Sequence, residues 1–139
     1  MSYRSVFRPG LFAGQTIVVT GAGSGIGRCT AHELAALGAH VVLVGRTVAK
    51  LEAVEAEIRE DGGEASHAAC DIRDEEAVKA TVAGIVAARG RIHGLVNNAG
   101  GQFPAALAGI SAKGWQAVIA NNLTGGFLMA REAYGQCMR

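Results

Sequence analysis

The amino-acid sequence predicts an α/β fold, with a doubly wound parallel sheet of about four strands and flanking helices. Short apolar runs alternate with amphipathic stretches along the chain, which is the pattern of parallel strands joined by helical crossovers. The first apolar run leads directly into a glycine-rich turn, an arrangement typical of nucleotide-binding units. The chain has 139 residues, of which 50% are hydrophobic, so we expect residues 1–139 to form a single domain.

Two strands and a helix are expected first. Residues 16–20, TIVVT, form an uninterrupted apolar run that is typical of a buried parallel strand. A helix is expected over residues 24–37, with Ile26, Leu34 and Leu37 recurring at helical spacing on its apolar face. The second strand is expected over residues 40–44, HVVLV.

A helix, a strand and another helix are expected next. Leu51, Val54 and Ile58 form an apolar stripe that the glycines at positions 62 and 63 bring to an end. The third strand is expected over residues 66–70. The helix after it opens at Asp74 with acidic residues in its first turn and closes near Arg89, an order of charges that complements the helix dipole.

One strand and two helices are expected in the last third of the chain. The strand, at residues 92–96, would lie at an uncovered edge of the sheet. Ser111 is placed to cap a helix that carries Trp115, and another helix is expected to begin near Asn122. Apolar side chains on the final helix would be left exposed, which invites self-association. These are Leu123, Phe127 and Leu128.

The glycine turn within residues 16–27, TIVVTGAGSGIG, is the most informative feature of the chain. Gly21 suits a sharp turn, Gly25 leaves room for phosphates, and Gly27 lets the helix pack close to the strand. The N-terminus of the helix presents backbone N–H groups and a positive dipole end to a pyrophosphate. The turn therefore indicates a Rossmann-type dinucleotide-binding unit; the alternative is a flexible loop that uses the same glycines.

Two strings resemble the N-terminal signatures of the short-chain dehydrogenase/reductase family. They are TGAGSGIG at residues 20–27 and NNAG at residues 97–100, and the resemblance covers nearly the whole chain. It implies that Asn122, in the string NNLTG, is the family's catalytic asparagine, which positions a water in a proton relay. The cofactor-binding residues that it implies are Thr20, Gly21, Ser24, Gly25, Ile26, Gly27, Asp71, Ile72, Asn98, Ala99 and Gly100.

The polar residues among these also have structural interpretations. Asn97 and Asn98 suit a chain turn after a strand, because asparagine bonds readily to nearby backbone. Asn122 suits a plain turn between two helices, where its amide bonds an unpaired backbone group. Asp71, which the resemblance places beside the adenine amino group, is also suited to cap the turn after the third strand.

Arg46 points to NADP as the cofactor. About 20 residues after the glycine turn, an acidic residue would bind the ribose 2′-hydroxyl of NAD. Here no carboxylate occurs between Glu33 and Glu52, whereas the guanidinium of Arg46 suits a 2′-phosphate. Lys50 is placed to reinforce such a site. The alternative is that Arg46 is a solvated residue at the entry of the next helix.

A complete catalytic centre is not expected from these residues alone. In the family that the chain resembles, a tyrosine and a lysine four residues later lie beyond the asparagine and handle the proton. Tyr3 and Tyr134 are the only tyrosines, and Phe7 and Met138 stand four residues after them. We therefore expect the N-terminal portion of a longer fold, with an incomplete sheet. The alternative is a nucleotide-binding or interaction module without catalysis.

The resemblance implies an NADP(H)-dependent oxidoreductase that transfers a hydride to or from a small-molecule substrate. The strings NNAGGQF and ISAKGW look most like the peroxisomal trans-2-enoyl-CoA reductase and dienoyl-CoA reductase branch. That likeness implies an enoyl or 3-oxoacyl thioester, such as an acyl-CoA, as substrate. Bacterial members that act on acyclic terpenoid alcohols are an alternative. The family also implies a homo-oligomer joined through the last helix.

Composition argues against several other classes of protein. A formal net charge of +1, without a basic block or stripe, argues against a nucleic-acid partner. The apolar runs are of strand length and no targeting signal is seen, so no membrane segment is expected and the cytoplasm is the expected location. The three cysteines and four histidines lack ligand spacing, which predicts buried thiols and no metal site.

Overall fold

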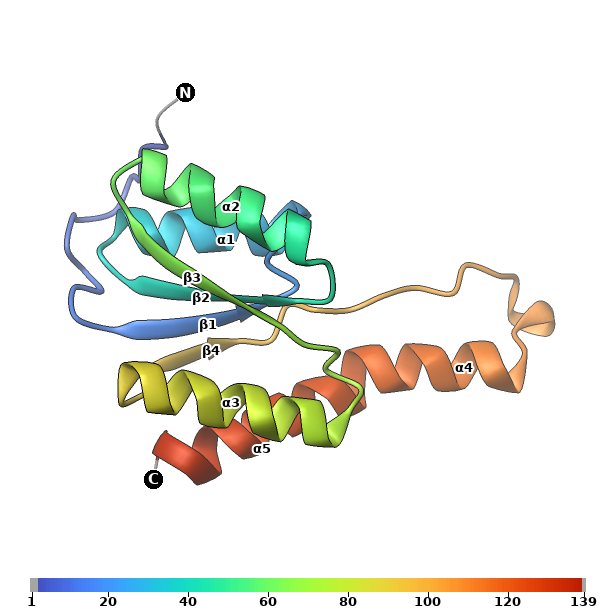
Figure 1. Cartoon of the computed structure of the whole chain (residues 1–139). Coiled ribbons are helices and arrows are strands. Elements are labelled where there is room, and N and C mark those ends of the chain that lie inside the picture. Colours follow the sequence, from blue (N-terminus) through green and yellow to red (C-terminus); the bar gives the residue numbers. More distant parts are fainter. Residues whose placement is uncertain (1–2, 139) are drawn as a thin grey trace.

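The computed structural model describes residues 3–138, which contain a parallel sheet of four strands. Their order across the sheet is β3-β2-β1-β4, so the chain builds outward on one side of β1 and then crosses to the other. The strands are β1 (Thr16–Thr20), β2 (His40–Gly45), β3 (Glu64–Ala69) and β4 (Gly94–Val96). Helices join these strands, which confirms the predicted doubly wound class (Figure 1).

Helices alternate with the strands and then follow one another at the end of the chain. The α-helices of residues 3–138 are α1 (Gly25–Ala36), α2 (Val48–Glu60), α3 (Glu75–Arg89), α4 (Ala112–Ile119) and α5 (Gly125–Ala133). A 3-10 turn, η1 (Leu107–Gly109), precedes α4. Two π-helical turns, η2 (Ala120–Thr124) and η3 (Tyr134–Met138), flank α5.

Apolar side chains cover both faces of the sheet, because successive residues of a strand point to opposite sides. On one face, Val19 and Leu43 belong to a core with α1 and α2. On the other face, Val18 and Val44 belong to a core with α3 and α5. Figure 1 shows the same two layers, with α1 and α2 on one side of the sheet and α3 and α5 on the other. The carboxyl ends of the strands stay open between these layers.

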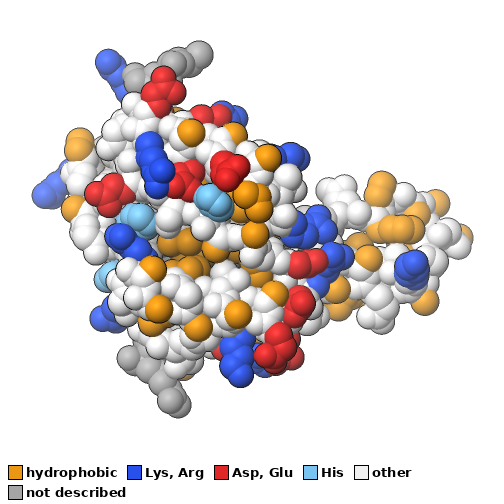
Figure 2. Space-filling view, viewed as in Figure 1, with side chains coloured by type: hydrophobic (Ala, Val, Ile, Leu, Met, Phe, Trp, Pro, Cys, Tyr) orange, Lys and Arg blue, Asp and Glu red, His pale blue; other side chains and the backbone are white. Residues whose placement is uncertain are grey.

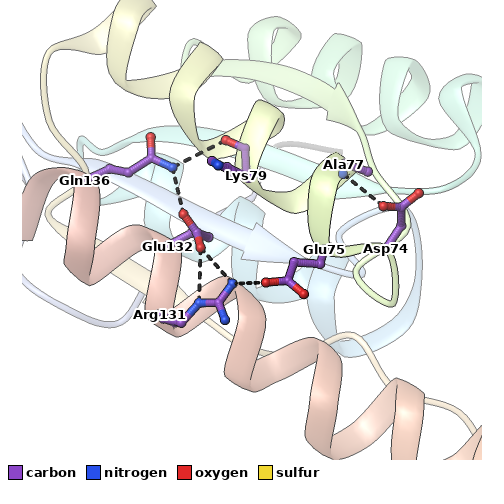
Figure 3. Close-up of polar contacts among 7 residues, drawn as sticks. All are labelled: Asp74, Glu75, Ala77, Lys79, Arg131, Glu132 and Gln136. Atoms are coloured by element: carbon purple, nitrogen blue, oxygen red, sulfur yellow. Dashed lines mark hydrogen bonds and ion pairs between the residues drawn. The ribbon is translucent and has the colours of Figure 1, made fainter.

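The start of α3 is capped as predicted, and its outer surface holds α5 (Figure 3). The Asp74 carboxylate accepts a hydrogen bond from a first-turn backbone N–H at 3.1 Å. The Arg131 guanidinium of α5 donates to the Glu75 carboxylate of α3 at 2.7 Å. One turn further on, the Gln136 side chain donates to the Lys79 carbonyl oxygen at 3.4 Å. The last helix therefore lies along α3.

The strand boundaries differ slightly from those predicted. β3 begins at Glu64, two positions before the expected start, because β2 pairs with it along its full length from His40 onward. β4 is shorter than expected and begins at Gly94. Before that point the His93 side chain takes part in the ladder, since its Nδ1 accepts a hydrogen bond from the Thr16 N–H at 2.9 Å. β4 is an edge strand, as predicted.

Helical backbone continues from α4 through η2 into α5, so the expected start of a separate helix near Asn122 is wrong. The π-helical turn η2 takes the place of the expected turn. Ser111 caps α4 as predicted, with its hydroxyl accepting a hydrogen bond from the Gly114 N–H at 3.0 Å. The continuous helix therefore carries Asn122 on a widened turn and not on a connecting loop.

Two apolar helix residues differ from the prediction in their exposure: Ile26, expected on the packed face, is exposed, and Leu128, expected to be exposed, is buried. Ile26 is 78% exposed, because Gly27, Ala31 and Ala35 form the side of α1 that approaches the sheet. Leu128 is only 4% exposed and packs in the core beneath α3, which corrects its expected exposure. Leu123 and Phe127 are exposed as predicted. Small residues on α1 bring the helix close to the strands, and Ile26 does not share their face.

The segment between β4 and α4 projects away from the sheet together with α4 (Figure 1). Hydrophobic side chains gather on this projecting part (Figure 2). The large side chains among them that are exposed by a third or more are Phe103, Leu107, Ile110 and Trp115. Among residues 3–138, no helix combines the length and the apolar character needed to cross a membrane.

The cysteines are not uniformly buried, which corrects the prediction. Cys70 is buried, Cys137 is half-buried, and Cys29 is exposed on α1. Cys29 lies two residues after Gly27, so it points away from the side of α1 that packs on the sheet. Burial raises the pKa of the Cys70 thiol, which keeps that side chain neutral near pH 7.

Candidate active site

A cleft of about 320 Å³ lies at the carboxyl ends of the strands. Its walls come from the glycine turn after β1, the end of β2, the residues after β3 and the loop after β4. The predicted cofactor residues that line it are Gly21, Ser24, Arg46, Asp71, Ile72, Asn98, Ala99 and Gly100. The fold therefore brings these residues, which are spread over positions 21–100 of the sequence, together in one hollow.

The glycine turn has the close contacts that its sequence predicts. Gly21 has a φ of +66°, and a Cβ there would lie 2.9 Å from the Asn98 amide nitrogen. A Cβ on Gly27 would lie 2.3 Å from the Gly21 carbonyl oxygen, so only glycine lets α1 start this close to the turn. Gly25 has a φ of +54° and open space where a side chain would stand. The structure thus leaves room above the first turn of α1.

The N-terminus of α1 is open to a ligand. The first backbone N–H groups of any α-helix lack intrahelical partners, and the Ser24 side chain at the N-cap makes no hydrogen bond to them. Ser24 itself lines the cleft. Such a terminus combines free donors with the positive end of the helix dipole, which favours a phosphate group.

Thr20 joins the turn after β1 to the loop after β4. Its hydroxyl oxygen accepts hydrogen bonds from the N–H groups of Asn98 and Ala99, both at 3.0 Å, and the hydroxyl donates to the Val96 carbonyl oxygen at 3.3 Å. The Asn98 amide returns a hydrogen bond to the Thr20 carbonyl oxygen at 2.9 Å. Thr20 is fully buried and does not line the cleft, so this side chain acts through the residues that it holds.

Asn97 and Asn98 brace different parts of the structure. Asn98 holds the glycine turn, whereas the Asn97 amide donates to the Gly126 carbonyl oxygen of α5 at 3.0 Å. The backbone also turns here, since the Asn98 N–H donates to the Val96 carbonyl oxygen at 3.0 Å. The residues expected to turn the chain therefore also brace it against the glycine turn and α5.

Asn122 lies on η2 and binds the loop after β4. Its amide nitrogen donates to the Gly101 carbonyl oxygen at 2.7 Å and to the Val118 carbonyl oxygen at 2.9 Å. Its amide oxygen accepts a hydrogen bond from the Gly101 N–H at 3.3 Å. The backbone partner expected for the Asn122 amide is therefore Gly101. Asn122 does not line the cleft, whereas the adjacent Asn121 does.

Asp71 is held by Arg73 at the adenine end proposed for the cleft. The guanidinium donates to both carboxylate oxygens, at 2.9 Å from Nε to Oδ1 and at 2.5 Å from Nη2 to Oδ2. The Arg73 N–H also donates to Oδ1 at 3.0 Å, which closes the turn expected of Asp71. These bonds, with a smaller contribution from Arg46, lower the pKa of Asp71 to about 2.

Two cations line the cleft at the end of β2. Arg46 and Lys50 are both exposed, and within residues 3–138 neither forms an ion pair with a carboxylate. Several other residues that line the cleft were not predicted from the sequence, including Gly23, Thr47, Leu51, Cys70 and Asn121. Gly23 was identifiable from its place in the glycine string, and Asn121 from its place beside Asn122. The others line the cleft because β2 and β3 end beside it and α2 begins there.

In residues 3–138, no three histidine, cysteine, aspartate or glutamate side chains gather in a way that suits a metal ion. The donors around the cleft are amides, hydroxyls, backbone N–H groups and cations. This set suits a phosphate-bearing organic ligand more than a metal.

Both the sequence and the structure of the chain are similar to those of known oxidoreductases. The family described as "short chain dehydrogenase" matches residues 15–139. The structure of a citronellol catabolism dehydrogenase from Pseudomonas aeruginosa PAO1 is 68% identical, covers 98% of this chain and 56% of its own, and superposes with a TM-score of 0.94. A metagenomic short-chain oxidoreductase in complex with NADP is 46% identical over 89% of this chain and 57% of its own, with a TM-score of 0.84.

Among curated proteins, a putative ketoacyl reductase of granaticin polyketide synthesis from Streptomyces violaceoruber is 41% identical. The match covers 89% of this chain and 46% of that protein. The chain spans about half the length of the curated relatives it matches.

Proposed function

The chain belongs to the short-chain dehydrogenase/reductase family of oxidoreductases, and we propose that it forms the cofactor-binding part of an NADP(H)-dependent member. The observation that carries this proposal is the cleft, where the open N-terminus of α1, the glycine turn and two cations meet. A dinucleotide needs these features at one end of a parallel sheet. The chain matches only about half the length of its relatives, so the activity of the whole protein is also a proposal.

The residues of the cleft fit NADP. The open space at Gly25 leaves room for a pyrophosphate beside the first turn of α1. Asp71 and Ile72, which line the cleft, would contact the adenine ring, and Ala99 and Gly100, which also line it, would lie toward the nicotinamide. These assignments follow the family resemblance. Ile26, which is exposed at the start of α1, would cover the pyrophosphate.

Arg46 is the proposed determinant of NADP over NAD. It lines the cleft at the end of β2, and no carboxylate occurs between Glu33 and Glu52 that would follow this strand and bind a ribose 2′-hydroxyl. Its planar donors suit a 2′-phosphate, and Lys50 stands one helical turn further along the same wall. The NADP-bound metagenomic relative supports this choice.

The bound nicotinamide would supply a hydride acceptor or donor. The chain's own contribution is to orient that group. Asn122 fixes the loop after β4 through Gly101, and it lies on a π-helical turn beside the cleft-lining Asn121. We therefore propose Asn122 as the residue that links the cofactor loop to the proton relay.

The proposed substrate is an enoyl or 3-oxoacyl thioester. The strings NNAGGQF and ISAKGW and the ketoacyl reductase relative support this class. A citronellol-related acyclic terpenoid is the second candidate, favoured by the 68% identity to a citronellol catabolism dehydrogenase. We further propose a homo-oligomer, supported by the apolar side chains that α4 and α5 leave exposed.

The 139-residue chain contains no tyrosine followed four residues later by lysine. We therefore propose that this chain binds the cofactor without sustained turnover. Steady reductase activity from a preparation of mass 14.2 kDa, with no longer species present, would contradict this part of the proposal.

The test combines an intact mass with two assays on the protein expressed from its natural gene. The first assay follows NADPH binding by fluorescence. The second follows NADPH oxidation with a trans-2-enoyl-CoA and with a 3-oxoacyl-CoA, and NADP reduction with citronellol. The whole protein is expected to bind NADPH and to turn over one substrate class. Failure to bind either NADPH or NADH would overturn the proposed function.

A further inference from the structure

Asp71 is the carboxylate that lines the cleft close to the proposed 2′-phosphate site. Asp71 follows β3 and Arg46 follows the neighbouring strand β2, and both residues line the cleft. The Arg46 guanidinium is near enough to contribute to the low pKa of Asp71. Without a cation bound to it, the Asp71 carboxylate would attract Arg46. It would also repel a phosphate, which carries between one and two negative charges near pH 7.

Arg73 binds the Asp71 carboxylate through both its side chain and its backbone. Its guanidinium binds both carboxylate oxygens and its backbone N–H binds Oδ1, so the carboxylate is fixed in charge and in direction. Arg73 itself is absent from the lining of the cleft. It therefore acts on a ligand only through Asp71.

We propose that Arg73 is a positioning residue for cofactor choice: by holding the Asp71 carboxylate in a two-point contact, it leaves Arg46 free to bind the 2′-phosphate of NADP. The proposal rests on the proposed function of the cleft. It explains why Arg46 forms no ion pair within residues 3–138 although a carboxylate borders the same hollow.

The geometry also explains why arginine suits this position. A guanidinium presents parallel donors that match the two oxygens of a carboxylate, whereas a lysine ammonium engages them as a point charge. The fork engages both Asp71 oxygens. Loss of the fork would allow Asp71 to exchange partners across the cleft.

The test compares NADP and NAD binding to the full chain and its variants by fluorescence or calorimetric titration. Arg73→Gln is expected to weaken NADP binding by about threefold to fivefold and to change NAD binding by less than about twofold. Adding Asp71→Asn to Arg73→Gln removes the released charge and is expected to restore the NADP preference. Arg131→Gln breaks the exposed ion pair with Glu75, and neither residue lines the cleft; it is the matched control and should change neither affinity.

An equal loss of NADP and NAD binding in Arg73→Gln, or no rescue by the second substitution, would overturn the inference. Absence of binding of either cofactor by the unmodified chain would instead overturn the proposed function, so the two failures are distinguishable. Circular dichroism checks that each variant folds. If Arg73→Gln does not fold, Arg73→Lys is used: it keeps the charge but lacks the fork, and a selective loss of NADP binding is again expected.

Discussion

Asn122 holds Gly101 by both backbone polar groups of that glycine. Its amide nitrogen donates to the Gly101 carbonyl oxygen at 2.7 Å, and its amide oxygen accepts from the Gly101 N–H at 3.3 Å. A side chain at the preceding residue, Gly100, would place a Cβ 2.5 Å from the same amide oxygen. The loop after β4 is therefore shaped to receive this one asparagine.

Replacing Asn122 by alanine should release the loop after β4. Two hydrogen bonds to Gly101 are lost, so the free energy of unfolding should fall by about 1–2 kcal/mol. Hydrogen exchange of the Gly101 N–H, measured by NMR, should become faster at the same time. Asn121→Ala is the matched control, because Asn121 is adjacent but does not bind Gly101 in the described hydrogen bonds. An unchanged exchange rate of the Gly101 N–H in Asn122→Ala would contradict the role of Asn122 in holding Gly101.

Replacing Arg46 by aspartate should shift cofactor preference toward NAD. The change removes a charge-assisted contact with the 2′-phosphate, so NADP binding should weaken by about tenfold or more. The new carboxylate can accept the ribose 2′-hydroxyl of NAD. Titration with both cofactors measures the shift. Lys50→Ala should have a smaller effect of the same sign, and an unaltered preference in Arg46→Asp would make Arg46 a bystander.

Replacing Gly27 by alanine should destabilise the start of α1. A Cβ there would stand 2.3 Å from the Gly21 carbonyl oxygen, so the helix must move away from the turn. Overpacking of this kind costs about 1–3 kcal/mol, which urea unfolding would detect. Gly84→Ala is the control: Gly84 lies in α3 with no atom within 4 Å of a Cβ, and alanine there should stabilise by about 0.5–1 kcal/mol. Equal effects of the two substitutions would refute the packing argument.

Stability should fall as the pH drops below the ordinary pKa of histidine. Burial and the nearby Arg89 guanidinium lower the pKa of His40 from 6.5. At a pH below about 6.5 the unfolded chain binds this proton more readily than the folded chain, so the free energy of unfolding decreases toward about pH 5. His40→Gln, which can keep a hydrogen bond to Ser66, should flatten this dependence. Chemical unfolding at several pH values measures it, and an unchanged slope would contradict the assignment.

The exposed apolar side chains of α5 and η2 should cause self-association. Leu123 is 64% exposed and Phe127 is 57% exposed, and exposed apolar surface favours contact between copies. Replacing both by glutamine should shift the species seen by light scattering toward the monomer. Val6→Gln removes a side chain that is 94% exposed at the other end of the chain and should leave the distribution unchanged. A monomeric unmodified chain would contradict the prediction.

Sequence was sufficient to place the strands and the cleft, because both depend on local signals. The run TIVVT and the glycines after it define β1 and the turn, and residues that follow the other strands meet there by topology. The direction of single helix side chains was harder to predict. Ile26 and Leu128 depend on which helix face packs inward, and small residues such as Gly27 and Ala31 decide this for α1.

The helical continuity of residues 112–138 was also not predictable from local preference. Asparagine is a poor helix-interior residue, so Asn121 and Asn122 suggested a break. In the structure, the Asn122 amide bonds outward to Gly101, which compensates for its low helix preference. That partner lies 21 positions away in sequence and comes into reach only in the folded chain.

The hydrogen bonds of the Thr20 hydroxyl determine when the cleft can form during synthesis of the chain. The hydroxyl accepts hydrogen bonds from Asn98 and Ala99, which are synthesised 78 and 79 residues later. The glycine turn thus leaves the ribosome early but acquires its opposite wall only when β4 reaches β1. A nascent chain that ends before β4 carries the signature without the complete site, so cofactor capture during synthesis waits for this long-range closure.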